Sequence, residues 1–335
     1  MALRMRISPW TRLFNRSVKK IAREATRAGS RAVAKAVKTQ VDKRRAPPGT
    51  GHWIAGVAMS AAGARRYRLY RPNDVAIGER LPLMVMLHGC GQDAGGFATS
   101  TRMNRIAARE RFLVLYPEQD RLANAHGCWN WFDTDSGRAH GESGLIMKAI
   151  DQVCLLYPVD RTRVAVAGMS AGASMAALLV SRHPERFKAV VMHSGVPPGT
   201  AHSSLSALSA MKGRRATLPL GGVPASPTAA WPPLLVIHGT ADGVVSARNG
   251  RAAVQAWADA AGAREGPSRG VRRGQRHAMT ITDFRRGRAM VASLVEVDGL
   301  GHAWSGGASR QPYGDPHGPD ASRMVWAFAK GHFKI

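Results

Sequence analysis

Several features are scarce in this 335-residue sequence, and each scarcity excludes a class of protein. Three cysteines are too few for a disulfide-dense scaffold. No apolar run approaches the roughly 20 residues that a membrane-spanning helix needs. The zinc patterns C-x-x-C and H-E-x-x-H are missing, as are the P-loop and the dinucleotide-binding fingerprint. We therefore expect chemistry that needs no metal and no cofactor.

Acidic residues are scarce as well. The sequence has 22 Asp and Glu against 48 Lys and Arg, which gives a formal net charge of +26. Residues 1–45 hold 14 of the basic and 2 of the acidic residues, so they contribute +12 and leave +14 for the rest. Residues 1–45 therefore carry nearly half of the excess positive charge.

Residues 1–45 are predicted to form a separate basic N-terminal arm. Its apolar residues recur at helical spacing, namely Ile7, Trp10, Leu13, Phe14, Val18 and Ile21. A basic amphipathic helix of this kind suits an anionic surface, such as a storage granule, a membrane or nucleic acid. The alternatives are a disordered basic tail and a wrongly assigned start codon. The arm lacks the apolar stretch of a secretory signal, so we expect a cytoplasmic or granule-associated protein.

Strands and helices alternate after a Pro- and Gly-rich linker at residues 46–52, and we assign 53–335 to one catalytic domain. Short apolar runs predict buried strands at 83–87, 112–116, 164–167, 189–192, 234–237 and 293–297. An alternating segment predicts an outer strand at 65–70, and helix-length segments occupy 144–156 and 249–261. This order predicts an α/β fold, a mainly parallel sheet with helices on both faces. Active residues should then gather at the carboxyl ends of the strands.

The most informative stretch is Gly168-Met-Ser170-Ala-Gly172, which lies between a β-branched run and a small-residue segment. The pattern G-x-S-x-G in a strand–turn–helix context is typical of a nucleophile elbow. Glycines flank the serine because the backbones crowd there, and the turn exposes the serine hydroxyl. Ser170 is therefore our candidate nucleophile.

A base and an orienting carboxylate follow in the chain. Asp242 comes directly after the strand at 234–237, and His302 follows the strand at 293–297 in a glycine-rich loop. The order Ser, Asp, His is that of α/β-hydrolases. We expect His302 to take the proton of Ser170, and Asp242 to fix the imidazole tautomer. Taken singly, each could be an ordinary loop residue.

A turn that can supply a backbone N–H donor lies upstream, at His88-Gly-Cys90-Gly-Gln, after the strand at 83–87. We call it the donor turn. We assign an oxyanion hole to the backbone N–H groups of Cys90 and Ala171. Three further histidines end strands and are predicted to be structural, bonding to loop backbone: His88, His193 and His238.

These residues carry a family resemblance. It rests on the segments already quoted and on Tyr116-Pro-Glu-Gln, Cys128-Trp-Asn-Trp-Phe, His193-Ser-Gly, His238-Gly-Thr-Ala-Asp and Gly301-His-Ala-Trp-Ser-Gly-Gly. Together, over about residues 50–333, they resemble the polyhydroxybutyrate depolymerase family of esterases, which is related to feruloyl and acetylxylan esterases. The resemblance implies an α/β-hydrolase fold, the triad of Ser170, Asp242 and His302, and an extracellular alternative for the compartment.

The resemblance also implies further roles. Trp304 and the pair Trp129 and Trp131 are candidates for lining the substrate site, with core packing as the alternative. Cys90 and Cys128 lie in motifs near the site, so a bridge between them is one possibility, in an oxidising compartment. Cys154 is expected to be a buried small apolar residue.

Three functions are compatible with the sequence. The first is an esterase acting on poly- or oligo(3-hydroxybutyrate) through an acyl-enzyme. The second is a feruloyl or acetyl esterase acting on plant-derived esters. The third is a granule-, membrane- or nucleic-acid-binding protein whose hydrolase domain is secondary or inactive. The chain shows no C-terminal binding module like those of polymer degraders, so we expect soluble oligomers or amorphous polymer as substrate.

Two segments are predicted to be irregular. Residues 197–233 are rich in Gly, Pro, Ser and Ala and are read as a surface excursion or a partial lid. Residues 264–288 are rich in arginine, including Arg272, Arg273, Arg285 and Arg286. They are read as a solvated face, or as an anion-binding patch.

Overall fold

The structure, a computed structural model, describes residues 47–60, 63–217 and 231–333. Eleven strands of these residues form one sheet. In spatial order they are β1 (Gly51–Ser60), β2 (Gly63–Pro72), β4 (Leu113–Pro117), β3 (Leu81–Leu87), β5 (Val159–Met169), β6 (Ala189–His193), β7 (Leu234–Gly239), β11 (Ala289–Val297), β10 (Met279–Arg286) and β8 (Arg264–Glu265), with β9 (Arg269–Val271) also paired to β10.

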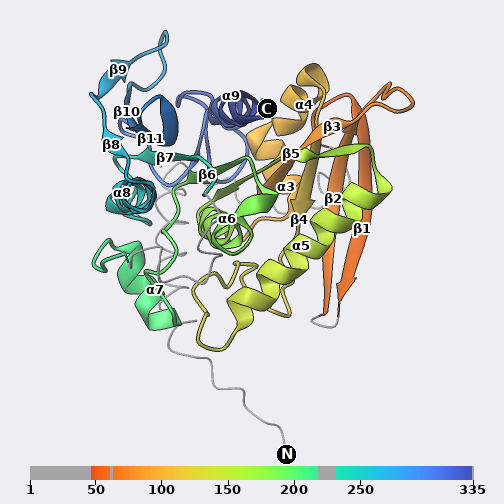
Figure 1. Cartoon of the computed structure of the whole chain (residues 1–335), viewed down its shortest axis with the longest axis horizontal. Helices are drawn as coiled ribbons and strands as arrows, with labels where there is room; N and C mark the ends of the chain where they lie inside the picture. Colours follow the sequence, from red (N-terminus) through yellow and green to blue (C-terminus); the bar gives the residue numbers. More distant parts are fainter. Residues whose placement is uncertain (1–46, 61–62, 218–230, 334–335) are drawn as a thin grey trace, which may run out of the picture. The chain divides into compact units, whose positions relative to one another are not determined.

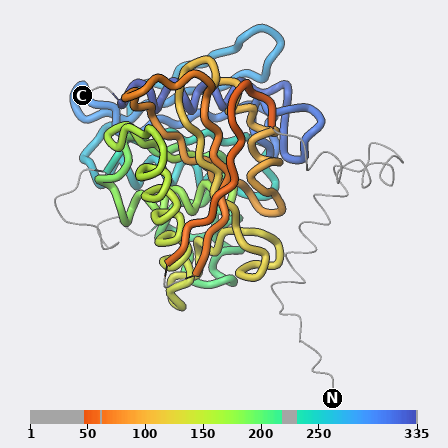
Figure 2. The backbone as a smooth tube through the Cα atoms, turned by 90° about the vertical axis from the view of Figure 1, so that its right-hand side faces the viewer, coloured from red at the N-terminus to blue at the C-terminus, as the bar shows by residue number. Residues whose placement is uncertain are grey.

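The sheet is parallel in its centre and antiparallel at its edges. Strands β4, β3, β5, β6, β7 and β11 run parallel. Strands β1 and β2 add an antiparallel pair at one edge, where Figure 2 shows them side by side. Strand β10 adds an antiparallel extension at the other edge, with β8 and β9 outside it. The parallel centre brings the carboxyl ends of six strands to one side of the sheet.

Helices cover both faces of the sheet (Figure 1). On one face lie α3 (Ala94–Thr101), α4 (Met103–Glu110) and α9 (Ala321–His332). On the other face lie α5 (Arg138–Leu156), α6 (Ala171–Arg182) and α8 (Arg248–Ala261). The predicted α/β architecture is therefore confirmed. The smaller elements are η1 (Pro184–Arg186), α7 (Ser204–Met211) and the two-stranded pair β12 (Trp304–Ser305) and β13 (Gly314–Asp315).

The central strands are buried on both sides, which explains why they read as unbroken apolar runs in the sequence. Alternate strand residues such as Met86 and Ala167 meet Phe97, Trp304 and Trp326 in one apolar cluster beneath α3, α4 and α9. Among the described residues, no helix is both long enough and apolar enough to span a membrane.

The edges of the sheet differ from the prediction. The segment 65–70 lies in β2, which is not an outer strand because β1 pairs outside it. Strand β1 begins at Gly51, within the predicted 46–52 linker. Residues 264–288 are largely strands β8, β9 and β10 and not irregular. The predicted arm at 1–45 lies outside the described residues, and so do residues 218–230 of the 197–233 segment. The described part of that segment contains α7.

Candidate active site

Ser170 lies in a sharp turn between β5 and α6, as the motif predicts. Its backbone has φ 55° and ψ −121°, a conformation that non-glycine residues rarely adopt. The turn is held by hydrogen bonds on both sides of the residue. The Ser170 N–H donates to the carbonyl of His193 (2.8 Å), and the Ser170 carbonyl accepts from the N–H of Ser174 (3.1 Å).

The two glycines of the motif allow this turn to form. A Cβ atom at Gly168 would collide with the backbone of Gly172, and one at Gly172 would collide with the carbonyl oxygens of Leu87 and His88. Helix α6 therefore begins in direct contact with the end of β3. The crowding expected from the sequence is confirmed, and it brings the upstream donor turn next to Ser170.

Ser170, His302 and Asp242 form one chain of hydrogen bonds. The Ser170 hydroxyl donates to His302 Nε2 (2.9 Å), and His302 Nδ1–H donates to Asp242 Oδ2 (2.8 Å). This is the tautomer in which both bonds are satisfied. The His302 side chain is only 8% exposed, and that of Asp242 is fully buried. The structure thus brings the three predicted residues together from loops that are 72 and 60 residues apart in the chain.

The surroundings of Asp242 favour its ionised form. Its Oδ1 accepts the N–H groups of Val244 and Val245 (both 2.9 Å). Burial alone would raise the pKa of Asp242, but the hydrogen bond and charge of His302, the nearby His238 and the Val245 N–H together hold the pKa below its ordinary value. The carboxylate is thereby kept negative beside the imidazole.

The donor turn lies against Ser170. A Cβ atom on Gly89 would sit 3.6 Å from Ser170 Cβ, so Gly89 borders the nucleophile. Ala171 is the first residue of α6, where backbone N–H groups have no partner within the helix. Among the described residues, neither the Cys90 N–H nor the Ala171 N–H donates a hydrogen bond. Both remain available to an oxyanion at Ser170.

The other strand-end histidines are bonded to the protein, as the sequence indicates. His88 donates from Nδ1 to the Gly89 carbonyl (2.9 Å) and accepts the Gln119 N–H at Nε2 (3.1 Å). His193 accepts the Ser305 N–H (3.1 Å), and His238 donates to the Val245 carbonyl (3.0 Å). Burial lowers the pKa of His88 to about 4 and that of His193 to about 3, so both rings are neutral near pH 7.

The tryptophan assignments are corrected by the structure. Trp304 and Trp129 are completely buried, so neither lines an open substrate site. The Trp304 ring stacks on His193, and its Nε1–H donates to the Ser322 hydroxyl (3.0 Å). Trp131, the other member of the pair, is also buried, with 8% of its surface exposed.

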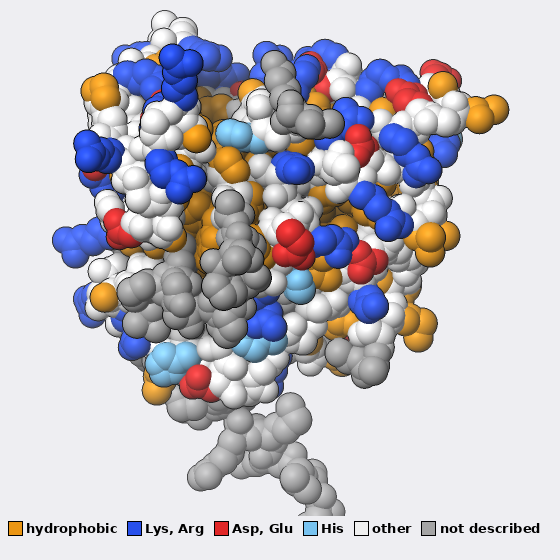
Figure 3. All heavy atoms as spheres, in the orientation of Figure 1, with side chains coloured by type: hydrophobic (Ala, Val, Ile, Leu, Met, Phe, Trp, Pro, Cys, Tyr) orange, Lys and Arg blue, Asp and Glu red, His pale blue; other side chains and the backbone are white. Residues whose placement is uncertain are grey.

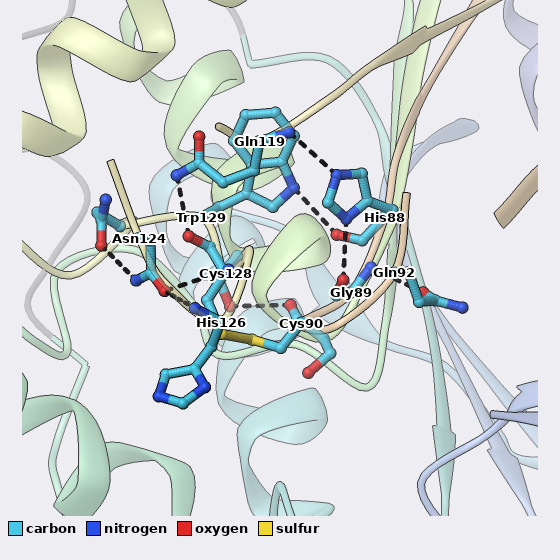
Figure 4. Close-up of a disulfide and its surroundings, with 12 residues drawn as sticks. His88, Gly89, Cys90, Gln92, Gln119, Asn124, His126, Cys128 and Trp129 are labelled. Carbon is cyan, nitrogen blue, oxygen red and sulfur yellow. Dashed lines mark hydrogen bonds between the residues drawn. A yellow bond between two sulfur atoms is a disulfide. The ribbon is translucent and has the colours of Figure 1, made fainter. Parts of the chain in front are cut away.

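Cys90 and Cys128 form a disulfide, and Cys154 is a buried free cysteine in α5, as expected. Figure 4 shows the bridge joining the donor turn to the segment that carries Trp129. Among the described residues, no three His, Cys, Asp or Glu side chains are grouped so that they could hold a metal ion.

A buried polar network behind the disulfide was not anticipated. Glu142, in α5, accepts hydrogen bonds from Gln119 Nε2 (2.6 Å) and from both nitrogens of Asn130. Arg65 lies over the Trp129 ring, 5.2 Å from its centroid, and also donates to Gln119. Sequence patterns did not reveal this network, because its members come from four separated segments. The two quoted motifs Tyr116-Pro-Glu-Gln and Cys128-Trp-Asn-Trp-Phe were its visible signals.

The sequence of this chain also matches a known protein family. Residues 65–273, more than half of the chain, match the model of the family described as Esterase PHB depolymerase. The chain belongs to this family. Its curated relatives include a poly(3-hydroxyalkanoate) depolymerase, acetylxylan esterases and feruloyl esterases.

Individual relatives agree with the family. A poly(3-hydroxyalkanoate) depolymerase C from Paucimonas lemoignei is 31% identical over 50% of this chain and 42% of its own length. Feruloyl esterase B from Neurospora crassa is 27% identical over 59% of this chain and 70% of its own. The matched part of this chain thus spans less than half the length of the bacterial depolymerase.

The solved structures confirm the fold. An acetyl xylan esterase from Aspergillus awamori superposes with a TM-score of 0.64 at 20% identity, covering 75% of this chain and 94% of its own. This esterase-family chain therefore has the α/β-hydrolase fold, with a mixed and centrally parallel sheet.

Proposed function

We propose that this esterase hydrolyses oligo- or poly(3-hydroxybutyrate) through a Ser170–His302–Asp242 triad and an acyl-enzyme. The observation that carries the proposal is the continuous hydrogen-bond chain from Asp242 through His302 to Ser170, at the carboxyl ends of the strands. The match to the depolymerase family and to a poly(3-hydroxyalkanoate) depolymerase supports the choice of ester.

In the first half of this mechanism, the Ser170 Oγ attacks the ester carbonyl while its proton passes to His302 Nε2. The carbonyl oxygen becomes negative and receives hydrogen bonds from the N–H groups of Cys90 and Ala171. Asp242 stabilises the imidazolium that forms. When the carbon–oxygen bond of the ester breaks, His302 returns the proton to the departing alcohol oxygen, and the acyl group stays on Ser170.

In the second half, water takes the place of the alcohol. His302 accepts a proton from the water as its oxygen attacks the acyl carbon, and the same two N–H groups stabilise the second oxyanion. The bond to Ser170 then breaks, and Ser170 recovers its proton from His302. A hydroxy acid leaves, and the site returns to its starting state.

A feruloyl or acetyl esterase is the second candidate, because the match to feruloyl esterase B covers 70% of that relative. The two candidates use the same triad and differ only in the acyl and alcohol groups that they accept. The third function considered, a binding protein with an inactive hydrolase domain, is disfavoured by the complete hydrogen-bond chain of the triad.

An ester panel tests the proposal. We expect the wild type to hydrolyse 3-hydroxybutyrate dimers, trimers and amorphous polymer faster than feruloyl or acetyl esters. Ser170→Ala should lower kcat by about 10⁴-fold or more, because the nucleophile is gone. The matched control is Ser268→Ala, on the far β8–β10 edge, which should retain full activity. Faster turnover of feruloyl esters would support the second candidate, and an inactive wild type would refute both.

A further inference from the structure

We propose that Cys128 is a positioning residue whose disulfide holds the Cys90 N–H in its oxyanion-binding orientation. The inference rests on the proposed function, since it assumes that the Cys90 N–H stabilises the oxyanion. It adds a role for a covalent bond that is not part of the triad. Figure 4 shows the residues on which the argument depends.

The donor turn is intrinsically flexible. Cys90 stands between Gly89 and Gly91, and Gly91 has a positive φ of 76°. Glycine has the widest conformational freedom of any residue, so a Gly-Cys-Gly turn fixes its own peptide planes poorly. An oxyanion donor contributes only when its N–H points at the place where the charge develops. The orientation must therefore come from hydrogen bonds to the Gly89–Cys90 peptide group and from restraints on the Cys90 side chain.

Hydrogen bonds hold the peptide group that contains the Cys90 N–H. Its carbonyl belongs to Gly89 and accepts from His88 Nδ1–H (2.9 Å) and from the Gln92 N–H (3.3 Å). Because a trans peptide is planar, its N–H points opposite to its carbonyl. Fixing the Gly89 carbonyl thus also sets the direction of the Cys90 N–H. Gln92 further accepts the Gly89 N–H at its Oε1 (2.9 Å).

The Cys90 side chain is attached to a rigid support. Cys128 is only 3% exposed, and its backbone is bonded on both sides. Its N–H donates to Asn124 Oδ1 (3.4 Å), and its carbonyl accepts from Gln119 Nε2 (2.9 Å). Gln119 is itself held by the buried Glu142 (2.6 Å). A disulfide to this support restrains the Cα of Cys90, and hence the plane that carries its N–H.

Hydrogen bonds also join the donor turn to residues 126–129, and they limit how far the turn can move when the disulfide is lost. The Gly91 N–H donates to the His126 carbonyl (2.9 Å), and Trp129 Nε1–H donates to the His88 carbonyl (3.0 Å). These bonds should keep the turn near its place when the disulfide opens. Deleting an oxyanion donor outright costs roughly 10²–10³ in kcat, so we expect a smaller loss, about 10-fold, from misorientation.

Two independent ways of opening the bond test the proposal. Dithiothreitol reduces the disulfide to two thiols and is itself oxidised to its cyclic disulfide, with two electrons and two protons transferred. Cys128→Ser removes the bond genetically. Cys154→Ala, which removes the buried free cysteine, is the matched control. Each protein is assayed on a soluble 3-hydroxybutyrate ester below its melting temperature, with Ser170→Ala as the inactive reference.

We expect kcat to fall about 10-fold in reduced wild type and in Cys128→Ser, with KM nearly unchanged, because the donor acts on the transition state. A trifluoromethyl ketone, which forms an oxyanion on Ser170, should lose affinity by a similar factor. Reoxidation should restore the wild type, and dithiothreitol should not affect Cys128→Ser. Cys154→Ala should behave as wild type.

Other outcomes overturn the inference. Unchanged kcat in folded, reduced wild type would show that the turn is held without the bond. A rise in KM with constant kcat, or a loss that follows the unfolded fraction alone, would assign the disulfide to binding or to stability. An inactive wild type would instead refute the proposed function, and the inference with it, so the two failures are distinguishable.

Discussion

Buried histidines at the strand ends tie the stability of this protein to pH. Burial lowers the pKa of His193 to about 3 and that of His88 to about 4, and it also lowers the pKa of His238. In the unfolded chain these rings have a pKa near 6.5. The stability that they confer is therefore complete above about pH 6.5 and is lost as the pH falls toward their folded pKa values.

Replacing His193 should weaken this dependence. We expect the wild-type free energy of unfolding to fall by about 1.4 kcal/mol per pH unit for each of His88 and His193 between pH 6.5 and 5. The amide oxygen of the new side chain in His193→Gln can accept the Ser305 N–H. The slope of this variant should be shallower by about 1.4 kcal/mol per pH unit, because it has one such histidine fewer. Urea denaturation at pH 7, 6 and 5 measures both slopes. Parallel curves for the two proteins would contradict the assignment.

The residues of the triad were predictable from the sequence because each one follows a strand. Ser170, Asp242 and His302 follow apolar runs, and the carboxyl ends of parallel strands converge. Tryptophan roles were not predictable in the same way. Trp304 stands two residues after His302, yet its ring is buried against His193 and Phe97. Sequence proximity does not fix which way a side chain points.

At the scale of elements, the contact between α6 and the end of β3 aligns the nucleophile with the oxyanion turn. Gly172 lies at this contact, where any side chain would meet the carbonyl oxygens of Leu87 and His88. The predicted helix–strand alternation gave the order of these elements. Their close approach followed only from the glycines of the motif, since a strand and a helix otherwise keep a side chain between them.

A single methyl group should therefore disturb this junction. We expect Gly172→Ala to lower the free energy of unfolding by about 1–3 kcal/mol, because the overpacked backbone must move. Gly144→Ala is the matched control: this glycine lies in α5 with open space around it. The control should gain about 0.5–1 kcal/mol, because alanine loses less entropy in a helix. Urea denaturation compares them, and equal effects would refute the crowding argument.

The missed edge strands have a physical explanation. Strands β8, β9 and β10 carry exposed arginines and lack the apolar runs of the central strands, because β10 buries alternate residues and the short strands β8 and β9 bury none. Strand β10 pairs with β11, and β8 and β9 pair with β10, so each depends on a neighbouring strand that local sequence does not specify. Charged side chains along such an edge also discourage pairing with a second sheet.

At the scale of the whole molecule, the basic excess is spread beyond the predicted arm. Figure 3 shows Lys and Arg side chains outnumbering Asp and Glu over one face of the molecule. Arg272, Arg273 and Arg286 are exposed and, within the described residues, form no ion pair. The solvated face that the sequence predicts for residues 264–288 agrees with this exposure.

The arm supplies a separable part of the charge. Residues 46–335 form a compact unit of their own, and deleting 1–45 removes +12 of the net charge of +26. We propose that the arm mediates attachment to anionic surfaces and contributes nothing to ester hydrolysis. The shortened protein should therefore retain wild-type kcat/KM on a soluble ester.

Binding to anionic lipid vesicles and to double-stranded DNA, measured from 50 to 400 mM salt, tests the attachment. Removing basic residues reduces the number of counterions released on binding, so the shortened chain should bind more weakly and with a shallower salt dependence. If the deletion weakens binding to vesicles and leaves binding to DNA unchanged, the partner is a membrane-like surface. Equal affinity and equal salt slopes for the two proteins would instead place binding on the arginine-rich catalytic domain.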